Sequence, residues 1–179
     1  MKRSILLFLI FFISCSQVQI VKKIRAYRIP PEIYRVQLPD SLIIKAESIS
    51  RGEFAYILVT RFTSHDLLGF MTKYSDIKPE DARNYWSEDY INTSCEYQIM
   101  RIMPDGNFYP DDPVKKFQAA IVLYRVAVNF QIVESNINIL SKSWDWAVSN
   151  AILSGDKNDY ITGEESVEAA VNFCNYILD

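Results

Sequence analysis

A pattern that occurs twice, about fifty residues apart, constrains the fold of this chain more than any other feature. Residues 104–113 read PDGNFYPDDP and precede an apolar run, and a weaker version at residues 155–160 precedes a second apolar run. Internal similarity at such a period is typical of stacked helical units, because one unit cannot bury its apolar face alone. The sequence therefore predicts repeats of a helix, a turn and a second helix. The expected fold class is all-α.

Residues 1–14 are typical of an export signal. Lys2 and Arg3 precede an almost unbroken apolar run at residues 5–13, which is too short to span a bilayer. Ser14 and Cys15 follow directly, and this arrangement resembles a bacterial lipoprotein signal. We expect cleavage before Cys15 and lipid attachment to it, with an ordinary signal and a chance cysteine as the alternative. The predicted location is the cell envelope: the periplasmic face of the outer membrane in a Gram-negative cell, or the plasma membrane in a Gram-positive one.

Residue usage argues against several classes of function. His65 is the only histidine in the sequence, which excludes a His-based metal site or a His-dependent catalytic triad. The formal net charge is −3 and no basic stripe occurs, so nucleic acid is not an expected partner. Residues 156–159 resemble a calcium loop only faintly, since Tyr160 stands where an oxygen ligand is required. We expect no cofactor, no metal and no enzymatic activity.

Two further cysteines, Cys95 and Cys174, lie in predicted helices. An exported compartment permits a disulfide between them. Two separate buried thiols are the alternative, and the sequence leaves both open.

Periodic apolar residues and capping signals place the helices. Ser50 with Glu53, and Thr162 with Glu165, have the spacing of capping boxes, in which each side chain satisfies a backbone donor near the other. Asp112 is expected to cap a helix that begins at Pro113, where the missing N–H costs least. Helices are expected over residues 54–59, 79–100, 113–128, 136–155 and 164–178.

Several segments together resemble the S-layer homology (SLH) family. Residues 99–110 match its turn, and Trp86 lies twenty-two residues before Phe108, a spacing typical of the repeat. Residues 50–55 resemble the opening of a second helix, and residues 146–155 the end of a first helix. The resemblance implies three units packed as a helical bundle. After the signal at 1–14 and a lead-in at 15–40, it divides the chain into a partial first repeat at 41–78, a second repeat at 79–130 and a third at 131–179.

The resemblance also implies a function, which is attachment to peptidoglycan or to a polysaccharide carried on it. An arginine at a helix N-terminus can offer its fork and the nearby backbone N–H groups to a carboxylate, while an aromatic ring covers a sugar face. The residues expected to bind glycan are Ser50, Arg51, Glu53, Trp86, Asp105, Gly106, Lys115 and Lys116.

The chain departs from the family pattern at several positions. Gln98 and Ile102 stand where glycines are usual. Lys116 replaces the motif arginine in the second unit, which keeps the charge but loses the bidentate fork. Gln118 replaces the motif glutamate there, and Ser166 is placed at the arginine position of the third unit.

Each candidate residue also has a structural interpretation. Ser50 and Glu53 can act as caps alone, and Arg51 can belong to a solvated or salt-bridged face. Asp105 and Gly106 are interpreted mainly as turn formers. For the remaining candidates we favour exposed charge for the two lysines and core packing for the tryptophans: Lys115, Lys116, Trp86 and Trp146.

Three functions follow from these observations. The first is a membrane-anchored tether to the wall, through lipidated Cys15 at one end and glycan grooves at the other. The alternative is a scaffold that binds other envelope proteins after its glycan grooves have decayed, which the missing arginines favour. A glycan-cleaving enzyme is disfavoured because no two acidic residues form an obvious catalytic pair.

Overall fold

The computed structural model describes residues 41–74, 76–134 and 138–179 of the chain. The described residues form helices and no strands, so the all-α prediction is confirmed. The α-helices are α2 (Ser41–Ile44), α3 (Arg51–Ser64), α4 (Glu88–Glu96), α5 (Lys116–Asn129), α6 (Ile139–Ser149) and α7 (Gly163–Leu178), with short 3₁₀ turns η2 (Leu68–Phe70) and η3 (Glu80–Ala82). The predicted signal peptide, Cys15 and the lead-in at 15–40 lie outside the described residues.

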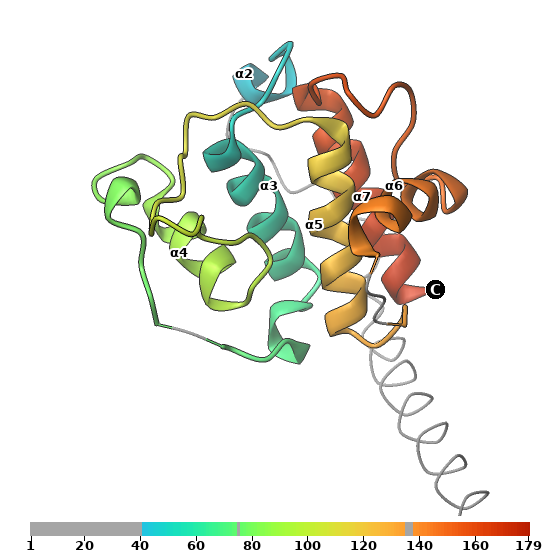
Figure 1. Ribbon diagram of the computed structural model, residues 1–179, viewed down its shortest axis with the longest axis horizontal. Coiled ribbons are helices and arrows are strands. Elements are labelled where there is room, and N and C mark those ends of the chain that lie inside the picture. The colour runs from blue at the N-terminus through green and yellow to red at the C-terminus, as the bar shows by residue number, and fades with distance from the viewer. Residues whose placement is uncertain (1–40, 75, 135–137) are drawn as a thin grey trace, which may run out of the picture.

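Among the described residues the three longest helices are α3, α5 and α7, and they run side by side in the same direction (Figure 1). Each is covered by an element from elsewhere in the chain: α4 packs on α3, α6 on α5, and the short α2 on α7. Fully buried aromatic rings fill the space between them. Phe62 of α3 lies 5.6 Å from Phe173 of α7, measured between ring centroids. Burying one such ring stabilises the fold by about 1.5–3 kcal/mol.

A closed ring of three backbone hydrogen bonds joins the segments that lead into the long helices. Ile49 N–H donates to the Ile161 carbonyl at 3.1 Å, and Ile161 N–H donates to Val114 at 2.9 Å. Val114 N–H donates back to Ile49 at 2.9 Å, which completes the cycle. Each of the three residues is buried and directly precedes the N-cap of its helix. The ring therefore holds the N-terminal ends of α3, α5 and α7 at one place.

Both predicted capping boxes are present. The Ser50 hydroxyl accepts from Glu53 N–H, and the Glu53 carboxylate accepts from Ser50 N–H at 2.7 Å. Thr162 and Glu165 make the same pair of bonds at the start of α7. At α5 the box is half complete: Gln118 accepts from the Lys115 N–H at 2.8 Å, and the lysine side chain has no acceptor to return the bond.

Two helix boundaries differ from the predictions. The helix expected over 79–100 is the 3₁₀ turn η3 followed by a shorter α4. The helix expected from Pro113 begins at Lys116, because Val114 takes part in the hydrogen-bonded ring and Pro113 pairs with Ser50 in a β-bridge. Both contacts need extended backbone, and periodicity within α5 carries no information about them.

The two cysteines are free and buried, so the disulfide alternative is wrong. Burial raises the pKa of Cys95 to about 11 and that of Cys174 to about 12. Both thiols therefore stay protonated at neutral pH and act as small apolar core residues.

The capping box of α7 gives a stability prediction. Replacing Thr162→Ala removes the acceptor for Glu165 N–H, and we expect a loss of about 1 kcal/mol in the free energy of unfolding. For a chain of this size the melting temperature should fall by about 2–4 °C. Thr162→Ser keeps the hydroxyl and should melt near the unchanged protein. Equal melting of the alanine and serine variants would show that the cap contributes nothing.

Candidate functional site

The Arg51 side chain holds the turn that precedes α5. Its Nε donates to the Phe108 carbonyl at 2.7 Å and its Nη2 to the Arg101 carbonyl at 3.0 Å. The guanidinium carbon also lies 4.6 Å from the centroid of the Phe108 ring, a cation–π arrangement. Burial lowers the pKa of Arg51, against a smaller opposite effect of nearby Cys95, Asp112 and Asp81. Arg51 is thus half-buried and hydrogen-bonded to backbone carbonyls. The sequence had suggested a solvated or a salt-bridged side chain instead.

The first N–H groups of α3 donate to protein carbonyls. Arg51 N–H donates to Asp112 at 2.9 Å, and Gly52 N–H donates to Pro110 at 2.8 Å. In the same way, the Lys116 N–H at the start of α5 donates to Asp159 at 2.9 Å. The expectation that these N–H groups face a ligand carboxylate is therefore wrong for these residues, because backbone carbonyls of the segments before α5 and α7 already accept their hydrogen bonds.

Asp105 and Gly106 act as turn formers, as predicted. The Asp105 carboxylate accepts from Asn107 N–H at 3.1 Å and from the Tyr109 hydroxyl, and the Tyr109 bond is the main cause that lowers the pKa of Asp105. Gly106 has φ +90°, which only glycine adopts without strain. Asp81, in η3, accepts from the N–H groups of Phe108 at 2.8 Å and Tyr109 at 2.6 Å. The turn is therefore held by Asp105 from within and by Asp81 from outside.

This turn, Arg51 and one face of α5 enclose a groove of about 450 Å³, called the basic groove below. Its lining combines apolar side chains with three arginines. The lining residues are Arg51, Met100, Arg101, Ile102, Met103, Pro104, Phe117, Gln118, Ile121, Val122 and Arg125.

The charges of the basic groove have one sign. Arg51, Arg101 and Arg125 contribute three positive charges, and no aspartate or glutamate is among the lining residues. Burial lowers the pKa of Arg125, and the nearby charge of Arg101 lowers it further. An anion in this groove would relieve repulsion between cations.

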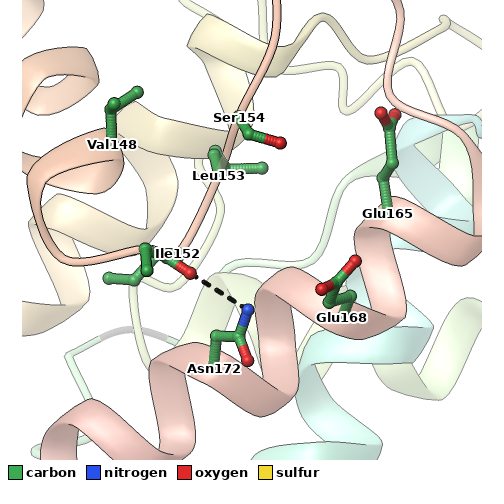
Figure 2. A pocket seen from close by; sticks show the side chains of 8 residues that line it. Val148, Ile152, Leu153, Ser154, Glu165, Glu168 and Asn172 are labelled. Atoms are coloured by element: carbon green, nitrogen blue, oxygen red, sulfur yellow. Dashed lines mark hydrogen bonds between the residues drawn. The ribbon is translucent and has the colours of Figure 1, made fainter.

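A second groove, called the acidic groove below, lies between the end of α6 and α7 (Figure 2). It has a volume of about 270 Å³ and is lined by Val148, Ala151, Ile152, Leu153, Ser154, Glu165, Glu168 and Asn172. In Figure 2, Glu165 and Glu168 extend from α7 beside the 151–154 segment, and Asn172 donates to the Ala151 carbonyl at 3.0 Å. The groove therefore carries negative charge where the basic groove carries positive charge.

Lys116 is neutralised at the edge of the acidic groove. Its Nζ lies 2.7 Å from Glu165 Oε1 and 3.3 Å from the Ser154 carbonyl. The residue is only 6% exposed, so the interpretation as an ordinary exposed charge is wrong. Lys115 is half-buried, with its Nζ 5.7 Å from the centroid of the Tyr160 ring.

The two grooves occupy equivalent places. Arg51 and Lys116 are the first residues of α3 and α5, each directly after an N-cap. Gln98, with φ +52°, follows α4, and Ala151, with φ +53°, follows α6. These two residues stand in left-handed backbone that favours glycine, which explains why glycine is usual at the Gln98 position. The same scaffold thus presents two grooves with different side chains.

The third equivalent position holds Gly163, not Ser166. Gly163 is the first residue of α7 after the N-cap Thr162, so the placement of Ser166 at the arginine position is wrong by three residues. Ser166 is buried and donates to the Gly163 carbonyl at 2.7 Å. A Cβ at residue 163 would lie 1.6 Å from the Ile43 carbonyl oxygen, so the backbone of α2 excludes any side chain there.

Trp86 lies on the surface beside α3. It is 55% exposed, with its ring 5.5 Å from Tyr56 and 6.1 Å from Tyr85 between centroids, so the core interpretation is wrong for this residue. Trp146, in contrast, is partly buried against the core, in contact with Tyr124 and Phe173.

A family model described as S-layer homology domain matches residues 73–120, which span α4, the fixed turn and the start of α5. This match covers 48 of the 179 residues, so residues 73–120 are similar to an S-layer homology domain. Such domains are generally cell-wall binding modules and not catalysts, and they imply association with the cell envelope. No curated protein matches the chain. Among the described residues, no helix is long and apolar enough to cross a membrane.

The SLH resemblance led to Arg51 but missed Arg101 and Arg125. Arg125 lies seven positions after Gln118 on α5, a spacing that places both on one helix face. That periodicity was available in the sequence. Arg101 carried no comparable signal, because only the folded turn brings it to the same groove.

The Lys116–Glu165 pair gives a pH prediction. Burial alone would raise the pKa of Glu165, but hydrogen bonds from Lys116 and Thr162 outweigh it and lower the pKa below its ordinary 4.5. The stabilisation is therefore complete above pH 4.5 and is lost as the pH falls below that value.

Glu165→Gln keeps an acceptor for the α7 cap and removes the charge. We expect its free energy of unfolding at pH 7 to be about 1–3 kcal/mol lower than that of the unchanged protein. The gap to the unchanged protein should narrow as the pH falls below 4, measured by urea unfolding at several pH values. A gap that stays constant with pH would contradict the assigned role of the pair.

Proposed function

We propose that this chain is a non-catalytic envelope lipoprotein that attaches to peptidoglycan or to a polysaccharide carried on it. Cys15 would hold the lipid, and the SLH domain would hold the wall polymer. The chain would thus tether membrane to wall.

One observation carries the proposal: the basic groove lies within a chain whose formal net charge is −3. Three arginines gather there among apolar side chains such as Met100 and Ile121. An oligosaccharide with acidic groups needs both features, because cations pair with its charges and apolar surface covers its ring faces. Most of the residues that line the groove also lie within the segment that matches the SLH family.

The predicted glycan-binding residues take different parts in this proposal. Arg51 forms one wall of the basic groove while it holds the turn. Ser50 and Glu53 support Arg51 by capping its helix. Asp105 and Gly106 shape the turn, and Trp86 offers an exposed ring to a sugar. Lys115 and Lys116 stand at the acidic groove side and are not expected to contact an acidic polymer.

We further infer that the chain contains three SLH-type units, at 41–78, 79–130 and 131–179. The ring formed by Ile49, Val114 and Ile161 supports this division, since it joins equivalent positions of three helices. The capped starts of α3, α5 and α7 support it as well.

A scaffold that binds other envelope proteins is the second candidate. The acidic groove favours it, because Lys116 is already paired with Glu165 and an acidic polymer would be repelled there. The closed position at Gly163 also leaves no room for a third arginine. Binding to purified walls separates the two functions.

The first test is co-sedimentation of the full chain with purified sacculi, before and after acid removal of the attached polysaccharide. We expect the protein to pellet with intact sacculi. Loss of pelleting after acid treatment would identify the attached polymer as ligand, and unchanged pelleting would identify peptidoglycan. Failure to pellet with either preparation would contradict wall binding and favour the scaffold.

Trp86 gives a second test. Trp86→Ala should leave the melting temperature nearly unchanged, because the side chain is mostly exposed, and should weaken wall binding about three- to tenfold. Tyr74→Ala is a control for the loss of an exposed ring, since Tyr74 is 52% exposed. Neither ring lines a groove, and the SLH resemblance assigns a sugar contact to Trp86 alone. Equal binding by both variants would remove Trp86 from the site.

A further inference from the structure

Helix α6 carries an apolar stripe that the rest of the described chain leaves largely uncovered. Leu140 is 73% exposed and Val148 is 45% exposed. Trp144 lies between them at a spacing of four residues, which places all three on one face of the helix. Val148 also lines the acidic groove, so stripe and groove form one continuous surface, called the α6–α7 surface below. A connected apolar surface rimmed by charge indicates an interaction site.

The acidic groove holds one carboxylate that the fold does not use. Glu165 caps α7 and pairs with Lys116. Glu168 lines the same groove, is exposed, and forms no hydrogen bond or ion pair with any described residue. In Figure 2 its side chain extends into the space between α7 and the 151–154 segment. The α6–α7 surface therefore fits a partner that combines apolar side chains with cations.

The sequence separates its charges between the lead-in and the domain. Residues 41–179 contain 12 basic and 20 acidic residues, a formal net charge of −8, with the histidine neutral. Residues 16–40 contain five basic and two acidic residues, a formal net charge of +3. Such asymmetry within one chain is typical of a tail that contacts an oppositely charged surface.

The positive charge of the lead-in is concentrated in residues 21–28, called the cationic segment below. It reads VKKIRAYR and contains four basic residues, while the first acidic residue of the sequence is Glu32. Val21, Ile24 and Tyr27 recur among these cations at every third position. The cationic segment thus has the two features that the α6–α7 surface requires.

The lead-in joins the domain beside the acidic groove. The Ile43 carbonyl lies over Gly163, the first residue of α7, and Gly163 N–H donates to the Ala46 carbonyl at 2.9 Å. Glu168 follows Gly163 by five residues, which is about 8 Å along the helix axis. The twelve residues between the cationic segment and Ser41 can span up to about 40 Å. The segment can therefore reach every part of the α6–α7 surface.

We propose that the cationic segment docks on the α6–α7 surface of its own chain. Its lysine and arginine side chains neutralise Glu168, and its apolar residues cover the stripe on α6. Because segment and surface belong to one chain, even a weak contact is populated. The inference goes beyond the proposed function and does not depend on wall binding.

Docking has a consequence for the proposed tether. With the cationic segment undocked, the 25 residues from 16 to 40 separate Cys15 from the domain and span up to about 80 Å. With the segment docked, only the five residues from 16 to 20 remain free, which span about 17 Å. The contact would therefore set the distance between membrane and wall.

A photo-crosslinking experiment locates the cationic segment. Benzoylphenylalanine replaces Tyr27 in the full chain, held in a neutral detergent, and the crosslinked residues are identified by mass spectrometry. We expect crosslinks to residues 140–154 and 164–172 of the same chain, with a yield that does not change on dilution. Crosslinks spread over other elements, or crosslinked dimers whose yield falls on dilution, would overturn the inference.

Trypsin measures the same contact through the rate of cleavage within residues 22–28. Glu168→Lys should speed this cleavage at least about fivefold, because it replaces an attraction by a repulsion. Asp89→Lys is the control, since Asp89 is also exposed and lies on α4, across the bundle from α6 (Figure 1). High salt should speed cleavage of the unchanged chain as well. Equal cleavage of the two variants would contradict docking at the acidic groove.

Anionic phospholipid vesicles test the other surface that a cationic segment can bind. Docking predicts that the segment is protected from trypsin without vesicles. If protection requires anionic vesicles and is the same in Glu168→Lys, the membrane is the partner and the inference is overturned. None of these assays contains sacculi, so a failure of wall binding leaves their outcome unaffected.

Discussion

The rest of this structure depends on the ring of three backbone hydrogen bonds between Ile49, Val114 and Ile161. Each residue donates to one neighbour and accepts from the other, so none can shift along its strand of chain without breaking two bonds. Because each precedes a helix directly, the ring fixes where α3, α5 and α7 begin. The turn at 104–113 must then reach back to α3, which brings Arg51 against Phe108 and opens the basic groove beside it.

The scaffold and its chemistry are separable in this chain. Arg51 and Lys116 begin equivalent helices, yet one borders a groove without acidic residues and the other is paired with Glu165. At the third place, Gly163 meets the backbone of Ile43, and no side chain fits. Backbone hydrogen bonds thus keep the architecture regular, while a few side chains set the sign of the charge in each groove.

Local signals in the sequence predicted local structure well. The Ser50–Glu53 and Thr162–Glu165 capping boxes and the Asp105–Gly106 turn are present as expected, because each depends on residues within a few positions. The errors came from distant contacts. Pro113 does not begin a helix because Ser50 pairs with it, and Trp86 is exposed although its spacing resembles that of a core residue. The burial of Lys116 was not predicted, because its partner Glu165 lies forty-nine residues away in the sequence. The signal peptide and lipid at Cys15 remain predictions.

The position of α2 has a mechanical consequence. Gly163 N–H donates to the Ala46 carbonyl at 2.9 Å, and the backbone at Ile43 lies directly over Gly163. Tension applied to the chain ahead of Ser41 would therefore pass through α2 to the capped start of α7, one of the three central helices, and on through the Ile49–Ile161 bond into the ring. The outer helices α4 and α6 lie off that path. Load from the membrane side would thus enter the fold at its best-connected point and reach α5, which borders the basic groove, through the ring.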